Sequence, residues 1–222
     1  MNTVNAKNRG YFKIESATRA FNFDFKNKVV LDIGSSTGGF TQYALDHGAT
    51  KVIAVEKGTN QMVSPLRFDP RIELHEKTDI FDIRTQTVPS EGIRSAAARG
   101  RAPAAHGDGP AGRGPMKELV CVPDIIVADV SFISLTKILK HAKDNLANKN
   151  TDFIVMLKPQ FEARKEQLFK GVVKNETIRR EIIKNFEYWL KTNGFIVIKK
   201  HDNELKGKTG NRERFYYLKL AK

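Results

Sequence analysis

Residues 29–40 constrain the fold of this chain most: an apolar run passes through an acidic residue into a glycine-rich turn. The glycines at positions 34, 38 and 39 can adopt positive φ and let a ligand approach the backbone closely. A nicotinamide fingerprint reads G-x-G-x-x-G and holds a pyrophosphate, whereas this turn reads Asp-x-Gly-x-x-x-Gly-Gly and places Asp32 where a phosphate would be repelled. The pattern therefore favours S-adenosylmethionine (SAM), whose sulfonium and ammonium groups are cationic.

A second carboxylate follows the next apolar run. Residues 51–55 lead into Glu56, about 20 residues beyond the glycines, where such folds bind ribose hydroxyls. We therefore predict that Glu56 is the ribose ligand. The alternative is a tight strand-to-helix turn next to a solvated glutamate, a pattern that occurs without any cofactor.

Length and charge limit the class of protein. The 222 residues suffice for one α/β domain over residues 1–222, with little chain left for a second. A net charge of +13 and a pI near 9.8 predict a polyanionic partner, with nucleic acid as the leading candidate. A merely soluble basic surface is the alternative. The charge is uneven, since residues 158–222 hold 17 Lys and Arg against 8 Asp and Glu.

The single cysteine, Cys121, excludes an internal disulfide. Its apolar neighbours Val120 and Val122 predict a buried thiol, as expected in a reducing cytoplasm. The N-terminus has no apolar segment typical of a secretion signal, and no apolar run approaches the roughly 18 residues that span a bilayer. We therefore expect a soluble, cytoplasmic protein with no membrane span.

Apolar runs typical of strands recur along the chain with helical patterns between most of them, at residues 29–33, 51–55, 125–129, 153–157, 195–199 and 214–220. This alternation predicts a Rossmann-like α/β fold with a doubly wound, mainly parallel sheet. Apolar residues at helical spacing from 176 to 193, followed by Gly194, predict a helix that faces the core. The last two runs are joined by the polar residues 201–211, which predicts an antiparallel edge pair with an exposed basic loop.

Residues 89–116 differ from the rest of the chain in composition. They consist mainly of Ala, Gly, Pro and Arg, whereas the flanking chain is rich in Lys, Ile, Phe and Asn. The segment has too little apolar bulk to form a core, which predicts a disordered insertion in a loop. Its arginines could contact RNA phosphates; a neutral, tolerated insertion is the alternative.

Charged residues follow two of the predicted parallel strands. Asp129 comes directly after one apolar run and Lys158 directly after the next. Because open α/β sheets bind ligands at the carboxyl ends of their strands, we expect the two side chains to be neighbours at the mouth of the sheet. Asp–Lys pairs are more often structural than catalytic, but this position favours catalysis.

Five motifs of the chain resemble, in the same order, those of the hemolysin-A (TlyA) family of ribosomal RNA 2′-O-methyltransferases, relatives of the FtsJ-type enzymes. They lie at residues 32–40, 129–134, 158–162, 171–173 and 210–213. The resemblance implies a catalytic tetrad of Lys13, Asp129, Lys158 and Glu213. The resemblance also implies a SAM pocket formed by Gly34, Ser35, Ser36, Thr37, Gly38, Gly39, Phe40, Glu56 and Asp79. Together with Asp32, these are the predicted cofactor-binding residues. We assign no metal ligand.

The implied reaction is methyl transfer to a ribose 2′-hydroxyl, which needs the oxygen about 3 Å from the methyl carbon. Lys158 is the candidate to take the proton or to stabilise the charge on the oxygen. Lys13 would supply a second cation and contact the adjacent phosphate, while Asp129 would orient Lys158. Glu213 would position Lys13 or the ribose. The sequence leaves the choice between the two roles of Lys158 open.

The expected partner is RNA, either ribosomal RNA or ribosomal subunits. Family members usually carry an N-terminal RNA-binding domain, whereas this sequence begins directly at the methyltransferase region, which leaves substrate targeting open. We expect RNA to be held mainly by cations around the loop before Glu213, namely Lys199, Lys200, Lys206, Lys208, Arg212 and Arg214.

Two other functions remain as alternatives. One is a SAM-dependent enzyme with another acceptor, although residues 129–132 lack the Asn/Asp-Pro-Pro-aromatic motif expected of an N-methyltransferase. The other is a non-catalytic RNA-binding or membrane-active protein, which the intact tetrad argues against.

Overall fold

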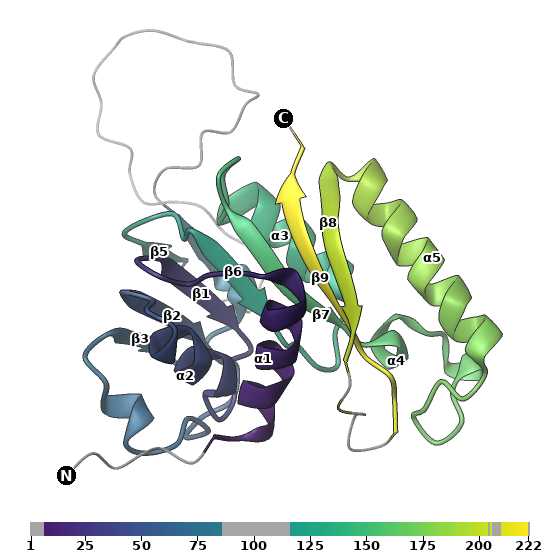
Figure 1. The fold of residues 1–222 in the computed structure, drawn as a ribbon, viewed down its shortest axis with the longest axis horizontal. Helices are drawn as coiled ribbons and strands as arrows, with labels where there is room; N and C mark the ends of the chain where they lie inside the picture. Colours follow the sequence, from purple (N-terminus) through teal and green to yellow (C-terminus); the bar gives the residue numbers. More distant parts are fainter. Residues whose placement is uncertain (1–6, 86–115, 204, 206–209, 222) are drawn as a thin grey trace, which may run out of the picture.

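The computed structural model describes residues 7–85, 116–203, 205 and 210–221. They form a seven-stranded sheet of order β3-β2-β1-β6-β7-β9-β8 and a separate two-stranded sheet, β4-β5 (Figure 1). The strands are β1 (Val29–Ile33), β2 (Lys51–Val55), β3 (Ile72–His75), β4 (Ile83–Thr85), β5 (Lys117–Leu119), β6 (Ile125–Ala128), β7 (Asp152–Leu157), β8 (Phe195–Asp202) and β9 (Arg214–Leu220).

The direction in which the sheet grows reverses next to β1. The chain first adds β2 and β3 on one side of β1, then returns to place β6 and β7 on the other side, all in parallel. Val30 of β1 accordingly pairs with Val52 on one side and with Ile125 on the other. Such a reversal leaves a crevice outside the carboxyl ends of the two central strands, where open α/β sheets bind ligands.

The last two strands form the predicted antiparallel pair. β9 pairs antiparallel with both β7 and β8, with Leu157 opposite Arg214. Because β9 begins where β7 ends, the residues just before β9 lie at the same edge as the carboxyl ends of the parallel strands. This register brings Glu213 to the end of the sheet where Asp129 and Lys158 emerge.

Helices cover both faces of the sheet. Helices α1 (Arg9–Phe21) and α2 (Gly39–Asp46) lie on one face, and α3 (Leu135–Asn145) and α5 (Glu176–Thr192) on the other (Figure 1). Successive side chains of a strand point to opposite faces of the sheet, so Val30 packs with the α1–α2 core and Leu31 with the α3–α5 core. Burial on both faces explains why the parallel strands are nearly continuous apolar runs.

Helix ends follow local capping chemistry. The Asn175 side chain accepts hydrogen bonds from the backbone N–H groups of Thr177 and Ile178, and this caps the start of α5. The helix ends at Thr192, and Gly194 follows with φ of +78°. The helix predicted from 176 to 193 is thus confirmed, one residue shorter at its C-terminal end.

All six predicted strands occur, with small changes at their ends: the third stops at Ala128, the fourth starts at Asp152 and the fifth continues to Asp202. The sequence patterns did not reveal β3, β4 and β5. Strand β3 lies at the sheet edge and is only partly buried, while β4 and β5 have three residues each, too few for a periodic pattern.

Three further expectations concern surface features. All but the last residue of the 89–116 segment lies outside the described residues, so its predicted disorder stays a prediction. The prediction of a buried thiol was wrong in part, because Cys121 is partly exposed next to the exposed Val120. No described helix is both long enough and apolar enough to cross a membrane.

Candidate functional site

A cavity of about 590 Å³ opens at the carboxyl ends of β1 and β6, at the point where the sheet reverses. Gly34, which follows β1, and Asp129, which follows β6, both line it. Gly34 has φ of +80°, and a Cβ added there would lie 3.3 Å from the carbonyl oxygen of Asp129. Glycine therefore lets the loops after β1 and β6 approach each other beside the cavity.

The other two glycines of the turn allow close packing within the protein. Gly38, with φ of +88°, precedes α2, and a Cβ added there would overlap the side chain of Leu66. A Cβ on Gly39 would overlap Asn8 and the first turn of α1. An added Cβ at Gly38 would thus meet the protein itself, and the assignment of Gly38 as a cofactor contact stays a prediction.

Glu56 lies at the rim of this cavity and is held by the turn. Its Oε2 accepts a hydrogen bond of 2.9 Å from the Ser36 N–H, and its Oε1 accepts one of 2.7 Å from the Gly58 N–H. The Gln61 side-chain amide lies 3.5 Å from the same Oε1, so of about four acceptor positions on the carboxylate one remains for a ribose hydroxyl. Glu56 is thus pre-oriented at the end of β2, facing the cavity.

Asp32 lies beneath the turn and does not line the cavity. It is 1% exposed, and its Oδ2 accepts a hydrogen bond of 2.6 Å from the Thr41 hydroxyl of α2. Burial, opposed by the Thr41 bond and assisted by the charges of Asp129 and Glu56, raises the pKa of Asp32 to about 7. The Asp32 Oδ1 is buried without a hydrogen-bond partner among the described residues, and the electrostatic role of Asp32 toward a cofactor stays a prediction.

Asp79 starts the short helix η2 (Ile80–Asp82) by accepting a hydrogen bond from the Phe81 N–H. Its other oxygen forms an ion pair of 3.0 Å with Lys57, and both residues line the cavity. Of the predicted cofactor residues, the cavity is therefore lined by Gly34, Ser36, Glu56 and Asp79. The remaining ones lie behind or beside it: Asp32, Ser35, Thr37, Gly38, Gly39 and Phe40.

The four residues of the implied tetrad meet at the edge of the sheet as one chain of ion pairs. Lys158 Nζ lies 2.6 Å from Asp129 Oδ1, and Lys13 Nζ lies 3.6 Å from Asp129 Oδ2. Lys13 Nζ also lies 2.9 Å from Glu213 Oε2. Each of the four side chains is at most 20% exposed. Two ammonium groups and two carboxylates thus alternate in a partly desolvated network.

Each tetrad member comes from a different element. Lys13 lies in α1, Asp129 follows β6, Lys158 follows β7 and Glu213 precedes β9. Lys158 Nζ also donates a hydrogen bond of 2.8 Å to the Ser131 hydroxyl, and Asn203 Nδ2 donates one of 3.3 Å to Glu213. Both ends of the network are therefore anchored by neutral polar groups.

Two of the sequence motifs are joined through Glu162, whose role the sequence did not reveal. Its carboxylate accepts 2.7 Å hydrogen bonds from the Ser134 hydroxyl and from the Leu135 N–H at the start of α3. Burial raises the pKa of Glu162, although the Ser134 bond opposes this shift. Glu162 belongs to the short helix α4 (Pro159–Glu162), which follows Lys158 directly, so this contact ties the Lys158 loop to the Asp129 loop.

Phe132 is a second feature that sequence patterns did not single out. Phe132 is 92% exposed and lines the cavity. Its φ of +64° is a left-handed conformation that is unfavourable for a bulky side chain. The ring centroid lies 5.2 Å from that of Phe161. Backbone strain of this kind persists where the surroundings impose it, and it is common at ligand sites.

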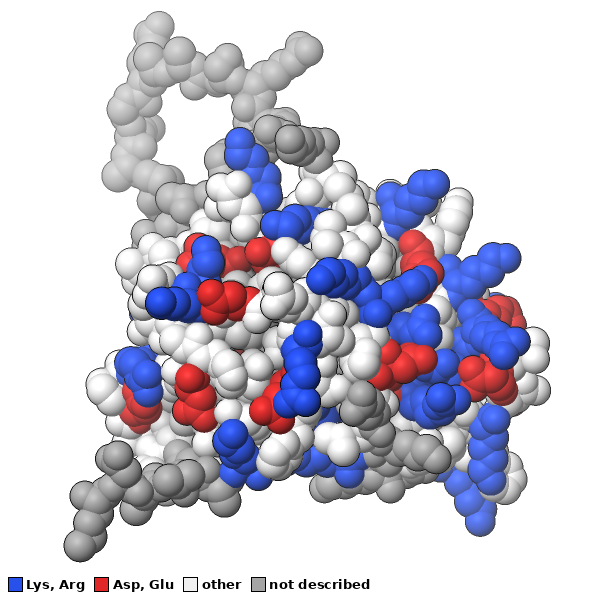
Figure 2. Space-filling view, viewed as in Figure 1, with Lys and Arg blue, Asp and Glu red and all other residues white. Residues whose placement is uncertain are grey.

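The expected RNA surface is only partly supported. Figure 2 shows Lys and Arg gathered over α5 and the C-terminal strands, but acidic side chains lie among them. Lys200 pairs with Glu187, Lys199 Nζ donates to the Phe21 carbonyl oxygen, and Arg214 binds Asp202 through two hydrogen bonds. The last contact, with the charge of Arg179, lowers the pKa of Asp202 to about 2.

These three cations therefore already have partners within the protein, and their role as RNA contacts stays a prediction. Arg212 is 57% exposed and remains available, although its guanidinium lies 3.9 Å from Glu176. Lys206 and Lys208 lie outside the described residues. No group of three His, Cys, Asp or Glu side chains in the described ranges is arranged to hold a metal ion.

The comparisons with known proteins decide the family. The model of the FtsJ-like methyltransferase family matches residues 6–220. The chain belongs to the FtsJ-like methyltransferase family. It is 33% identical to Hemolysin A of Brachyspira hyodysenteriae over 90% of this chain and 71% of that protein. It is also 33% identical to the 23S rRNA (cytidine-2′-O)-methyltransferase TlyA of Campylobacter jejuni, over 94% of this chain and 69% of that protein.

A solved structure shares the fold of this FtsJ-like chain. It is a candidate hemolysin from Lactococcus lactis, 30% identical, with a TM-score of 0.75 over 96% of this chain and 87% of that one. The chain spans between 66% and 71% of the length of the curated relatives it matches. The resemblance to the hemolysin-A family and the Rossmann-like methyltransferase fold are thereby confirmed.

Proposed function

We propose that this protein transfers a methyl group from SAM to a ribose 2′-hydroxyl of ribosomal RNA. The observation that carries the proposal is the Lys158–Asp129–Lys13–Glu213 network, which meets the cavity at Asp129. The relatives named as rRNA (cytidine-2′-O)-methyltransferases support the same acceptor. A ribosomal substrate would place the activity in the cytoplasm.

The cavity suits SAM in size and charge. Its volume of about 590 Å³ lies within the range usual for small-ligand sites. Three carboxylates line it, from Glu56, Asp79 and Asp129, against the single ammonium of Lys57. Glu56 would hold a ribose hydroxyl of the cofactor, and the acidic lining favours its cationic methionine end. When bound, SAM supplies an electrophilic methyl group.

Lys158 is the residue best placed to act on the 2′-hydroxyl. Its Nζ is fixed by Asp129 and by Ser131, at the edge of the cavity that both of these residues line. Two roles fit this position: as a neutral amine Lys158 accepts the hydroxyl proton, and as an ammonium it donates a hydrogen bond to the oxygen as charge develops there. The hydroxyl proton would pass to Lys158 in the first role and to water in the second.

The other tetrad members would position this group and the RNA. Lys13 lies between Asp129 and Glu213. Asp129 also binds Lys158, so this shared carboxylate holds the two ammonium groups close together without a direct contact between them. There it can contact the phosphate next to the target ribose. Phe132 offers an exposed ring beside the cavity on which a base can stack.

The decisive test is an assay of the purified protein with radiolabelled SAM and, in parallel, small subunits, large subunits and total RNA. We expect label in ribosomal RNA, and nuclease digestion should recover it in 2′-O-methylated nucleosides. Label in a methylated base would show a different acceptor. Absence of transfer to every RNA, together with intact SAM binding, would favour a non-catalytic protein.

A further inference from the structure

Residues 169–174 form a small protruding hairpin, which we call the 169–174 hairpin. Phe169 and Val172 exchange two backbone hydrogen bonds of 2.9 and 3.0 Å around the central residues Lys170 and Gly171. Both central residues have positive φ, +49° and +78°, as in a type I′ turn. This turn favours Asn-Gly, so a lysine at its first central position is held in a strained conformation.

An aromatic ring and two lysines are gathered on this hairpin. Phe169 is 54% exposed, and Lys174 Nζ lies 4.0 Å from its ring centroid, in cation–π distance. Lys170 Nζ lies 5.8 Å from the same centroid. Within the described part of the chain, neither lysine has an acidic partner within 4.0 Å. A single exposed phenylalanine is unremarkable, but a ring flanked by two unneutralised cations has the composition of a nucleic-acid contact.

The hairpin is tied to the catalytic segment by a buried side chain. Asn211, which is 2% exposed, accepts a hydrogen bond of 3.1 Å from the Val173 N–H and donates one of 3.1 Å to the Gly171 carbonyl. Asn211 lies two residues before Glu213 of the tetrad. This contact joins residues 171–173, for which the proposed reaction gives no role, to the 210–213 motif that carries Glu213.

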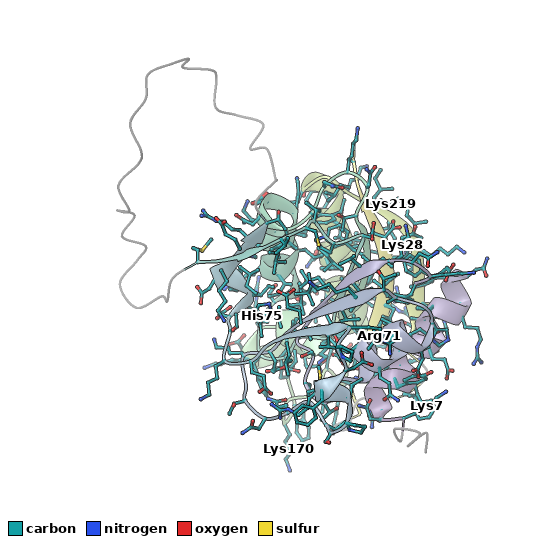
Figure 3. All side chains as sticks on the ribbon, turned by 90° about the vertical axis from the view of Figure 1, so that its left-hand side faces the viewer. Lys7, Lys28, Arg71, His75, Lys170 and Lys219 are labelled. Atoms are coloured by element: carbon teal, nitrogen blue, oxygen red, sulfur yellow. The ribbon has the colours of Figure 1, made fainter. Side chains whose placement is uncertain are left out.

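The hairpin also projects from the same edge of the molecule as the tetrad. It follows α4, which starts next to Lys158 at the carboxyl end of β7 (Figure 1). Figure 3 shows the Lys170 side chain at the lower margin of the molecule, pointing away from its body. RNA that places a ribose at the tetrad therefore lies on the side of the protein from which the hairpin extends.

We propose that the 169–174 hairpin is an RNA contact in which an unpaired base stacks on Phe169 while Lys170 and Lys174 bind the adjoining phosphates. The inference rests on the proposed function, because it takes the RNA substrate as the occupant. Stacking needs a ring with an accessible surface, and phosphates need cations not already neutralised, which the hairpin supplies together. Asn211 would keep this contact in register with the tetrad.

The test measures RNA binding by the full chain with three variants: Phe169→Ala, Lys170→Asn and Lys174→Gln. Binding of a labelled single-stranded RNA of about 12 nucleotides and of the matching duplex is followed by fluorescence anisotropy at several salt concentrations. Lys170→Asn is the most informative variant, since asparagine suits the type I′ turn better than lysine while removing the charge. The matched controls on α5 are Tyr188→Ala, which removes a ring that is 70% exposed, and Lys191→Asn.

We expect Phe169→Ala to weaken single-strand binding about tenfold, with a smaller effect on the duplex. Lys170→Asn and Lys174→Gln should each make the salt dependence shallower by about 0.7 unit. The thermal stability of Lys170→Asn should not fall. If the turn had only a structural role, this variant would not change the salt dependence of RNA binding. Unchanged affinity in all three variants, or equal losses in the α5 controls, would overturn the inference.

Methyl transfer to ribosomal subunits separates this inference from the proposed function. If the wild-type chain methylates ribosomal RNA and the hairpin variants show unchanged KM and RNA affinity, the hairpin role is wrong and the proposed function stands. If the variants lose RNA affinity while the wild-type chain transfers no methyl group to RNA, the RNA contact stands and the proposed function is wrong.

Discussion

Lys158 Nζ lies 2.6 Å from Asp129 Oδ1, although 29 peptide bonds separate the two residues and they follow different strands. The pairing of β6 with β7 places the two carboxyl ends side by side, so the contact is set by the sheet. It fixes the position of an ammonium group at the rim of the cavity.

Replacing Lys158 should separate catalysis from cofactor binding. We expect Lys158→Ala to lower kcat for methyl transfer about 100-fold or more, while SAM affinity changes only a few-fold, because Lys158 does not line the cavity. Single-turnover kinetics and calorimetry measure the two quantities. The matched control is Lys143→Ala, which removes a partly buried lysine bonded to the Asn193 carbonyl, outside the site. Equal losses of SAM affinity and rate would make Lys158 structural.

Lys13 and Glu213 should behave as one unit. Because Glu213 contacts Lys13 at 2.9 Å, we expect it to act on the proposed reaction by holding that ammonium in place. We expect Glu213→Gln and Lys13→Met each to lower kcat/KM, and the double variant to be no worse than Lys13→Met alone. A double-mutant cycle measures this coupling. Lys140→Ala, which breaks an exposed ion pair with Asp144, should leave kcat/KM unchanged, and additive losses at Lys13 and Glu213 would contradict the coupling.

Gly38 should matter for the stability of the fold. Gly38→Ala adds a Cβ at φ of +88° against Leu66, and we expect the free energy of unfolding to fall by about 2 kcal/mol or more. Gly210→Ala is the matched control, since φ there is +92° but nothing lies within 4 Å of the added Cβ; its cost should be about 1 kcal/mol from backbone strain alone. Urea unfolding gives both values. Equal costs would show that packing against Leu66 is unimportant.

Asp32 should make the cofactor-free protein less stable as the pH rises. Its pKa is about 7 in the folded state and near 3.8 in the unfolded chain, so between these values the folded state binds more protons. The contribution of Asp32 is therefore present at low pH and is lost as the pH rises through about 4 to 7, by about 3 kcal/mol between pH 5 and pH 8.

The measurement is urea unfolding of the wild-type chain and Asp32→Asn at pH 5 and pH 8. Asparagine keeps the oxygen that accepts the Thr41 bond but does not titrate in this range. We expect the variant to lack most of the pH-dependent loss. The same pH dependence in both proteins would show that Asp32 is not its source.

Local sequence patterns were sufficient for the strands and for the kinds of residues at their ends. Apolar runs bounded by Gly34, Asp129 and Lys158 predicted both the strands and the functional edge, because buried parallel strands must be apolar along their length and their carboxyl ends must carry the polar groups. The placement of Lys13 and Glu213 came from the family resemblance, since neither lies in a pattern that marks it as functional.

Tertiary structure alone decided which of these residues face the ligand cavity. Asp32 and Gly34 are two positions apart, yet Gly34 lines the cavity while Asp32 is buried against Thr41 beneath the turn. The sequence could not reveal that Leu66 fills the space above Gly38, or that Lys199 donates to the Phe21 carbonyl oxygen, because these contacts join segments far apart in the chain. Residue types and spacing determined the strands and the kinds of polar groups at their ends. Packing between distant elements determined which of these groups face the cavity and which are bound within the protein.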